Sequence, residues 1–442
     1  MPEAARVDWE QALTDWLTPF LGALHHKVRC RWAPVYVRGL LGPGERKSVQ
    51  PMAARVAPRD NDQLHHFISS PAWNTGPLET VLAGAADRLV GGADAVLIID
   101  DTALPKKGVH SVGVAPQYCG ALGKTANCQS LVSLTLAHDD VPVPVALRLY
   151  LPKEWTQNRA RCRKAGVPVP CRSFRSKGAI ALAELDRLLA AGVRFGCALA
   201  DAGYGAGARF RRGLAQRVAC WAVGIPKAQK VYSAAVTVTW PPAAPTGRRR
   251  QHGLASELPV TAEAALADCR WRRICWRHGT KGPLAAHFAA RRVRVAEGPQ
   301  AQNGRRLPGA AELWLVGERR AGGERKYYLA SHPAETSLTT LAATVKARWA
   351  CEQAHQQMKE ELGLDHFEGR SWAGLHHHAL LTMIAFAFLQ HRRLAESRKR
   401  GKNADRPAAA TDAAGRPPRA ARSARRPHYT PMSQLPEPRQ PA

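Results

Sequence analysis

Four acidic residues stand at positions where carboxylates can do chemistry. Asp100 and Asp101 end one apolar, β-branched run, and Asp201 ends a second. Glu352 lies far downstream, in a segment with helical spacing. Because open α/β sheets place their reactive groups at the ends of strands, we expect three of these carboxylates to converge on one point. Carboxylates that lie close together repel one another unless cations neutralise them, and hard oxygen ligands suit Mg2+ or Mn2+. The pattern therefore predicts a metal site, and two ions about 3.5 to 4 Å apart would support in-line displacement at a phosphodiester.

Each acid also has a purely structural interpretation. An aspartate at the end of a strand commonly forms a turn or caps the next helix. For Asp201, which precedes Ala-Gly-Tyr-Gly, this interpretation is at least as good on composition alone. Neighbouring strand residues point to opposite faces, so we expect only one of Asp100 and Asp101 to face the site. The pattern does not decide which one.

Three downstream residues share one stripe of a predicted helix. Arg348 and Glu352 are four residues apart, and Lys359 lies two turns beyond Glu352. On spacing alone, an exposed face with salt bridges is the favoured interpretation of this stripe.

The elements that must position these residues follow from periodicity. Residues at the N-terminus have apolar side chains at intervals of three and four, which predicts helices, while 231–330 alternates with a period of two. Beyond 395 the chain is rich in Arg, Pro and Ala and cannot bury enough apolar surface to fold alone. The predicted organisation is a helical DNA-binding domain (1–90), a first part of an α/β core (91–230), a β-rich insertion (231–330), a last part of the core (331–394) and a disordered basic tail (395–442).

The charge balance indicates a polyanion as partner. The 442 residues carry 64 Lys and Arg against 35 Asp and Glu, a net charge of +29. The longest apolar run, 379–389, has only the length of a core helix, which argues against a membrane span. The N-terminus lacks both a basic start and an apolar stretch, so we expect no secretory signal and a cytoplasmic protein.

Cysteines and histidines form no metal-binding motif in the sequence. None of the ten cysteines has zinc-ligand spacing, and buried free thiols are expected. Consecutive helical residues point about 100° apart, so the three histidines at 376–378 cannot share one ion. They are predicted to form a surface or phosphate-facing cluster.

Three ordered motifs resemble the DDE transposases of bacterial insertion sequences, in the group with a β-rich insertion before the final Glu. The motifs are Leu-Ile-Ile-Asp-Asp-Thr (97–102), Ala-Leu-Ala-Asp-Ala-Gly-Tyr (198–204) and Arg-Trp-Ala-Cys-Glu (348–352) with the Lys that follows it. That group's signature is Tyr, two residues, Arg, three residues, Glu, six residues, Lys. Arg348, Glu352 and Lys359 match it, whereas Val345 stands at the Tyr position. The resemblance covers about residues 30 to 392.

This resemblance implies an α/β fold with a ribonuclease-H-like mixed sheet flanked by helices. It implies that Asp101, Asp201 and Glu352 are the catalytic metal ligands, because the acid immediately before Thr matches the family's first Asp. By the same similarity, Arg348 and Lys359 would contact phosphates near the transposon end. Such contacts position DNA rather than read its bases.

Four further basic residues are expected to contact DNA. Lys106 and Lys107 follow the first acidic pair and are interpreted as phosphate ligands rather than as a solvated turn. In the N-terminal helices, Arg46 and Lys47 follow a Gly/Pro turn, where a fixed scaffold can present them.

The leading functional hypothesis is a transposase that uses Mg2+, with Mn2+ as substitute and two ions in the site. It would cut double-stranded DNA at transposon ends and join the ends to target DNA. Pairing of two ends implies a homodimer in the bacterial cytoplasm, associated with the nucleoid and with no membrane. The alternatives are a non-catalytic DNA-binding protein derived from a transposase, acting as repressor or scaffold, and a stand-alone metal-dependent nuclease.

Overall fold

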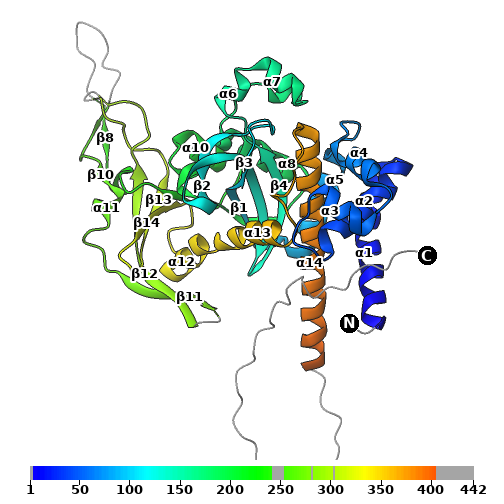
Figure 1. Cartoon of the computed structure of the whole chain (residues 1–442). Helices are drawn as coiled ribbons and strands as arrows, with labels where there is room; N and C mark the ends of the chain where they lie inside the picture. Colours follow the sequence, from blue (N-terminus) through cyan, green and yellow to red (C-terminus); the bar gives the residue numbers. More distant parts are fainter. Residues whose placement is uncertain (1–2, 241–252, 280–281, 302–303, 405–442) are drawn as a thin grey trace, which may run out of the picture. The chain divides into compact units, whose positions relative to one another are not determined.

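The chain packs as two units in the computed structural model, which describes residues 3–240, 253–279, 282–301 and 304–404 (Figure 1). A helical unit comprises the residues up to Leu82 and from Gln357 onward, and a sheet unit comprises Ala83–Gln356. The helices α5 (Gly76–Val90) and α13 (Trp349–Glu360) contain the two boundaries. The segment 331–394, predicted as one part of the core, is therefore divided within α13.

The helical unit is built on amphipathic helices. It contains α1 (Glu3–Leu24), α2 (Lys27–Leu41), α3 (Val49–Val56), α4 (Asn61–Ser69) and α14 (Trp372–Ala404). Leu13, Leu17 and Leu24 are buried along one face of α1, as their spacing predicts. The indole of Trp16 donates a hydrogen bond of 3.3 Å to the carbonyl of Ile384, which joins α1 to α14.

Helix α14 forms the centre of this unit. Its stretch Trp372–Arg398 is long and apolar enough to cross a membrane, but 83% of the apolar 18-residue segment within it is buried inside the protein, as in the core helix of a globular protein. The helix extends to Ala404, so the segment predicted as a tail from 395 begins with almost three further helical turns. The rest of that predicted tail, 405–442, lies outside the described residues.

The prediction of a surface histidine cluster is wrong. All three histidines at 376–378 are buried in α14 and are hydrogen-bonded within the helical unit. The ring nitrogens of His377 lie 2.9 and 3.1 Å from two backbone carbonyl oxygens, and His378 pairs with the hydroxyl of Tyr36 at 2.9 Å. Backbone and side-chain partners satisfy the polar atoms of these rings, which allows burial of residue types that are often exposed.

The described residues of the sheet unit form one 12-stranded sheet and a two-stranded ribbon. In the large sheet the strand order is β10-β7-β12-β13-β14-β6-β5-β1-β3-β2, with β4 paired to β3 and β11 paired to β12. The ribbon consists of β8 and β9. The strands are β1 (Gly92–Pro105), β2 (Ala115–Cys119), β3 (Lys124–His138), β4 (Val141–Leu149), β5 (Phe195–Ala200), β6 (Trp221–Ile225), β7 (Lys230–Ser233), β8 (Val238–Thr239), β9 (Leu254–Ala255), β10 (Val260–Thr261), β11 (Arg272–Gly279), β12 (Gly282–Val295), β13 (Glu312–Arg319) and β14 (Arg325–Ala330).

The large sheet is mixed but mostly antiparallel. Strands β1, β3 and β4 form an antiparallel meander, while β5 is parallel to both β1 and β6. The strands of 231–330 do not form a separate domain core, because β14 pairs antiparallel with β6 and continues the same sheet. The predicted mixed α/β sheet flanked by helices is therefore present.

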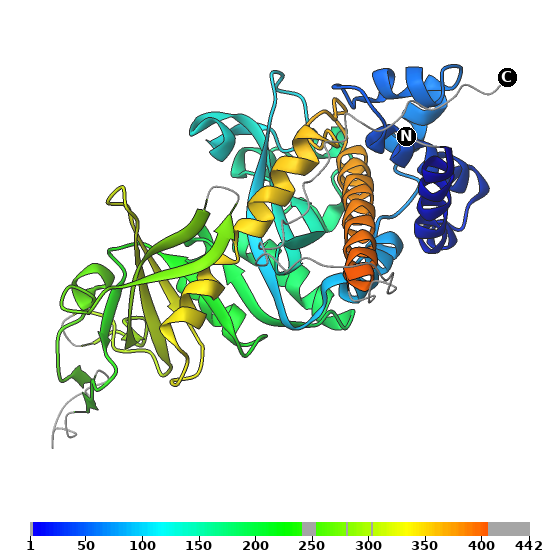
Figure 2. The same ribbon diagram turned by 90° about the horizontal axis from the view of Figure 1, so that it is seen from below.

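Helices cover the two faces of the central strands. In both views α12 (Leu338–Lys346) and α13 lie along one face of the sheet (Figures 1 and 2). Their apolar residues Leu341, Val345 and Cys351 pack in one cluster with Ile98 of β1 and Leu199 of β5. The other face of the meander is covered by α8 (Lys177–Ala190), whose Glu184 accepts a hydrogen bond of 2.7 Å from Arg148 of β4. The remaining short helices are α6 (Lys153–Thr156), α7 (Arg159–Lys164), α9 (Ala202–Gly205), α10 (Ala208–Ala215), α11 (Ala262–Ala265), η1 (Gly120–Leu122) and η2 (Val169–Cys171).

Candidate active site

The strand register places Asp100 and Asp201 side by side. Strands β1 and β5 are parallel, and their last paired residues are Ile99 and Ala200. The next residue of each strand is an aspartate, and neighbours in a parallel pair point to the same face. Asp101 points to the opposite face.

One arginine joins the carboxylates on the α13 face. Arg348, immediately before α13, forms ion pairs with both Asp100 and Glu352. The thiol of Cys351 donates a further hydrogen bond of 3.3 Å to Asp100, and the backbone N–H of Asp101 donates one of 2.8 Å. Both carboxyl oxygens of Asp100 are thus occupied by donors of the protein.

Burial and neighbouring charges set the electrostatics of this face. Burial raises the pKa of Asp100 to about 6, and the nearby charge of Asp201 also raises it, whereas Arg348 opposes the shift. Burial acts to lower the pKa of Arg348, but Asp100 and Glu352 outweigh burial and hold that pKa above its usual value. The charge of Asp201 also raises the pKa of Arg348. Asp100, Asp201 and Glu352 are therefore electrostatic neighbours around Arg348.

Asp101 has different partners, on the α8 side. Lys177, the first residue of α8, forms an ion pair with its carboxylate, and the hydroxyl of Tyr204 donates a hydrogen bond to it. Tyr204 also connects Asp101 to Asp201, because its backbone N–H donates to Asp201 at 3.2 Å. Burial holds the pKa of Tyr204 well above its usual value, and the charges of all three aspartates add to the effect. Tyr204 is thus the link between the two faces.

The structural interpretation of Asp201 holds in the structure. Its side chain caps α9 through the bond to Tyr204, as a strand-end aspartate commonly does. The same carboxylate lies in the acidic cluster. Capping uses one oxygen, so the second oxygen can serve a ligand.

The chemistry of the three proposed ligands suits a hard divalent cation, and Asp101 lies on the other face of β1 from Asp201 and Glu352. Asp101, Asp201 and Glu352 offer carboxylate oxygens, the ligands that Mg2+ and Mn2+ prefer. The side chains of Asp101 and Glu352 are 29% and 57% exposed, so an ion and a phosphate can reach them. Lys177 forms an ion pair with Asp101, and Arg348 forms one with Glu352.

The basic residues predicted to contact phosphates differ in their accessibility. Lys107 is exposed just after β1, and Lys106 beside it is half-buried. Arg348 is engaged by carboxylates, and Lys359 lies near the end of α13, half-buried. None of these four side chains is fully buried.

The two predicted contacts in the helical unit also differ. Arg46 is exposed and forms an ion pair with Glu368. Lys47 is buried, its ammonium donates to the carbonyl of Gly42, and burial with the nearby charge of Arg55 lowers its pKa to about 8. Lys47 is therefore not the exposed phosphate contact that we expected, because its buried ammonium group is hydrogen-bonded to a backbone carbonyl.

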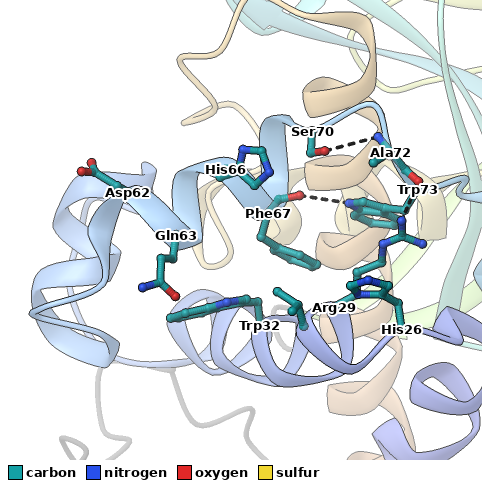
Figure 3. A pocket seen from close by; sticks show the side chains of 11 residues that line it. His26, Arg29, Trp32, Asp62, Gln63, His66, Phe67, Ser70, Ala72 and Trp73 are labelled. Carbon is teal, nitrogen blue, oxygen red and sulfur yellow. Dashed lines mark hydrogen bonds between the residues drawn. The ribbon is translucent and has the colours of Figure 1, made fainter.

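The helical unit has a pocket of its own (Figure 3). It lies between α2 and α4 and is lined by the aromatic side chains of Trp32, Phe67 and Trp73, with Arg29 and His66 beside them. The guanidinium of Arg29 is fixed by a bond of 2.7 Å to the carbonyl of Ala72. The pocket contains none of the predicted catalytic acids.

Sequence reasoning missed three partners of the acids. Lys177, Tyr204 and Cys351 contact Asp101 or Asp100, although they come from separate parts of the chain. Tyr204 and Cys351 lie inside the recognised motifs, but their contacts depend on strand register and helix packing. For Lys177 the sequence offers no signal.

The fold and the cluster together define a class of enzyme. A basic α/β protein with carboxylates gathered at neighbouring strand ends and on a covering helix is suited to metal-dependent cleavage of nucleic acids. The family model described as DDE superfamily endonuclease matches residues 19–283 of this chain. The chain belongs to the DDE superfamily of endonucleases, as its motifs predicted.

The chain is also similar to one curated relative and to one solved structure. The chain is 31% identical over 168 residues to a probable transposase for insertion sequence element IS701 from Microchaete diplosiphon. That alignment covers 38% of this chain and 41% of the relative, so it spans about two-fifths of the relative's length. Among solved structures, a piggyBac transposase synaptic complex with hairpin DNA aligns with a TM-score of 0.40 and 12% identity, over 84% of this chain and 67% of that chain.

Proposed function

We propose that this protein is a DNA transposase that cuts the ends of its element and joins them to target DNA. The observation that carries the proposal is the convergence of β1, β5 and α13, which brings Asp201 and Glu352 around one arginine beside the Asp100–Asp101 pair. The family supplies the endonuclease class, and the net charge of +29 favours a DNA substrate.

The proposed catalytic core is ribonuclease-H-like. The strand order β4-β3-β1-β5-β6 supports it, because an antiparallel meander there meets two parallel strands in a mixed sheet. In the proposed organisation the N-terminal helices bind the transposon end. The strands of 231–330 are an insertion before the helix that carries Glu352.

The proposed ligands are Asp101, Asp201 and Glu352. Asp101 is preferred to Asp100 because its carboxylate is more exposed and because it stands immediately before Thr102, as the family's first Asp does. A shared ion would require the Asp101 side chain to leave Lys177 and Tyr204, because it points away from the face of Asp201 and Glu352. Bound Mg2+ or Mn2+ would activate the attacking hydroxyl and stabilise the leaving oxygen. Asp100 is then a positioning residue that holds Arg348 against the site.

The basic residues would orient the DNA. Cations bound by the carboxylates would replace the charge that Lys177 and Arg348 now provide. The freed guanidinium of Arg348 could then contact a phosphate in a bidentate manner. Lys106, Lys107 and Lys359 would add phosphate contacts, and exposed Arg46 would contribute from the helical unit.

The cellular and assembly proposals follow from the reaction. Joining both ends of an element requires two active sites, so the working form is proposed to be a homodimer on double-stranded DNA. The proposed location is the bacterial cytoplasm, at the nucleoid.

The test is incubation of purified protein and Mg2+ with DNA that carries the inverted repeats flanking its own gene. Cut ends and joined products are scored for the parent and for Asp201→Asn. The proposal predicts both products for the parent and neither for the variant. Cutting without joining would indicate a stand-alone nuclease, and end binding without either product would indicate a repressor or scaffold.

A further inference from the structure

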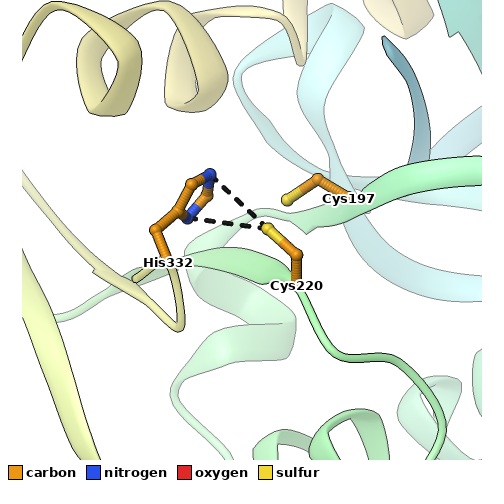
Figure 4. A group of neighbouring side chains, drawn as sticks. All are labelled: Cys197, Cys220 and His332. Carbon is orange, nitrogen blue, oxygen red and sulfur yellow. Dashed lines mark hydrogen bonds between the residues drawn. The ribbon is translucent and has the colours of Figure 1, made fainter. Parts of the chain in front are cut away.

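Two cysteines and a histidine meet at a second place in the sheet unit (Figure 4). They are Cys197 on β5, Cys220 immediately before β6 and His332 just after β14. One ligand atom of each, two thiol sulfurs and a ring nitrogen, lie within 4.8 Å of one another. Cys197 and His332 are buried, and Cys220 is half-buried.

The strand register of the sheet brings these residues together. Ala198 pairs with Trp221 in the parallel β5–β6 ladder. Cys197 and Cys220 are the residues immediately before this pair, one on each strand side. On the other side of β6, Ala222 pairs with Ala330 of β14, which returns the chain towards Cys220. Two hydrogen bonds of 2.9 Å between Ser331 and the backbone of Trp221 fix this return. The cluster is therefore held by the backbone of three adjacent strands.

Hydrogen bonding around His332 leaves one ring nitrogen available as a ligand. The hydroxyl of Thr344 donates to the carbonyl of Thr340 at 2.9 Å, so its oxygen is free to accept from Nε2 of His332, 3.4 Å away. Protonated Nε2 leaves Nδ1 unprotonated, and Nδ1 lies 3.7 Å from the sulfur of Cys220. A ligating histidine usually donates its other N–H to such an outer partner.

The distance between Cys220 and His332 is that of two ligands in a tetrahedral metal site. Zinc bonds of about 2.3 Å to sulfur and about 2.0 to 2.1 Å to nitrogen place the two ligand atoms about 3.5 Å apart. In the structure, the sulfur of Cys220 is 3.5 Å from Nε2 and 3.7 Å from Nδ1 of His332. Thiolate and imidazole select zinc over the hard cations that carboxylates bind.

Cys197, Cys220 and His332 also act on one another electrostatically. A hydrogen bond from Cys197 and the nearby His332 lower the pKa of Cys220 to about 5, although burial acts in the other direction. The hydrogen bond to Cys220 raises the pKa of Cys197, and burial raises it further. A metal bound through both sulfurs would displace the protons of the thiols to solvent.

We infer that Cys197, Cys220 and His332 bind one zinc ion, with water as the fourth ligand on the half-buried side of Cys220. This site goes beyond the proposed DNA chemistry and does not depend on it. The ion would tie β5, which leads to Asp201, to the connection from β14 into α12 and α13, which leads to Arg348 and Glu352. It would thus stabilise the frame that holds the acidic cluster.

The test is elemental analysis of the full-length protein, purified without a metal-affinity step. We expect about one zinc ion per chain in the parent and in a matched control, Cys275→Ser, which changes an exposed cysteine outside the cluster. Cys220→Ser and His332→Ala should reduce the zinc content to background. Unchanged zinc in Cys220→Ser, or an intact disulfide between Cys197 and Cys220 in the parent, would overturn the inference.

A second measurement uses the parent protein alone, so it tests the zinc site even if the variants fail to fold. The parent is stripped with chelator and titrated with Co2+, and thiolate-to-cobalt charge-transfer absorption is expected to saturate at one equivalent and to disappear on addition of zinc. No such absorption would also overturn the inference. Asp201→Asn should retain the zinc and the cobalt signal while it loses DNA cleavage, so failure of the zinc site and failure of the proposed transposase function give different results.

Discussion

The buried carboxyl group of Asp100 should make the stability of the metal-free protein depend on pH. Burial raises its pKa from 3.8 to about 6 despite the opposing charge of Arg348. The folded chain therefore retains this proton over a pH range in which the unfolded chain has lost it. The free energy of unfolding contributed by this group falls as the pH rises from about 4 to about 6, and then stays level. A shift of about two pKa units corresponds to about 3 kcal/mol.

Substitution of Asp100 by Asn isolates this effect. Asp100→Asn keeps the shape and an oxygen that can accept from the N–H of Asp101, and Arg348 keeps its ion pair with Glu352. The variant no longer titrates, so at pH 8 it should be more stable than the parent by up to about 3 kcal/mol. Near pH 4 the two proteins should agree within about 1 kcal/mol.

The assay is urea unfolding followed by tryptophan fluorescence, at pH values from 4 to 8 with chelator present. Asp94→Asn is the matched control, because it removes the same charge at an exposed position of β1. The control should follow the parent at every pH. A variant at Asp100 that is less stable than the parent at pH 8, or that keeps the pH dependence of the parent, would refute the reasoning.

Three further predictions concern DNA. Replacement of Asp101, Asp201 or Glu352 singly by Ala should abolish cleavage but leave binding of transposon ends largely intact in a gel-shift assay. Asp100→Ala should reduce cleavage less. If Asp100→Ala abolished cleavage while Asp101→Ala remained active, the roles assigned to the two aspartates would be reversed. Mg2+ and Mn2+ should support cutting, and Ca2+ should permit binding with little turnover because its looser coordination does not suit a tight two-metal geometry, so full activity in excess chelator would contradict the metal requirement. Deletion of 405–442, which is rich in arginine, should weaken binding to all DNA alike and flatten the dependence of log affinity on log salt; loss of the preference for cognate ends in competition binding would show that this segment also reads sequence.

The elements around the site were accessible from sequence because their patterns are local. The β-branched run before Asp100 lies in β1, and the apolar run before Asp201 forms β5. Helical spacing around Glu352 gives α13. Each of these patterns reflects burial of a strand or one face of a helix, which a few neighbouring residues determine.

Contacts between distant segments were not accessible in this way. The sequence leaves open which of Asp100 and Asp101 lies beside Asp201, because that depends on the register of two strands. The cluster of Cys197 with His332 forms only when β6 and β14 pair, so no spacing rule detects it. The histidines of α14 were misjudged because the partners of His377 and His378 come from other helices and loops.

The end of α14 was also placed too early. Glu396, Arg398 and their neighbours are polar, which indicated a tail, but such residues are good helix formers and extend a helix that has already nucleated in the core. The composition therefore marks where the side chains of α14 cease to be buried, not where the helix ends.

The most direct test of the central claim is to map the metal on the chain. Fe2+ takes the place of Mg2+, and ascorbate with peroxide then generates radicals that cut the backbone next to the bound ion. Joint metal binding by the three carboxylates predicts cuts near Asp101, Asp201 and Glu352 together, suppressed by excess Mg2+ and absent in Asp201→Asn. Cuts confined to other segments, or cuts at these three positions that Mg2+ does not suppress, would contradict the claim that strands β1 and β5 and helix α13 hold one metal site.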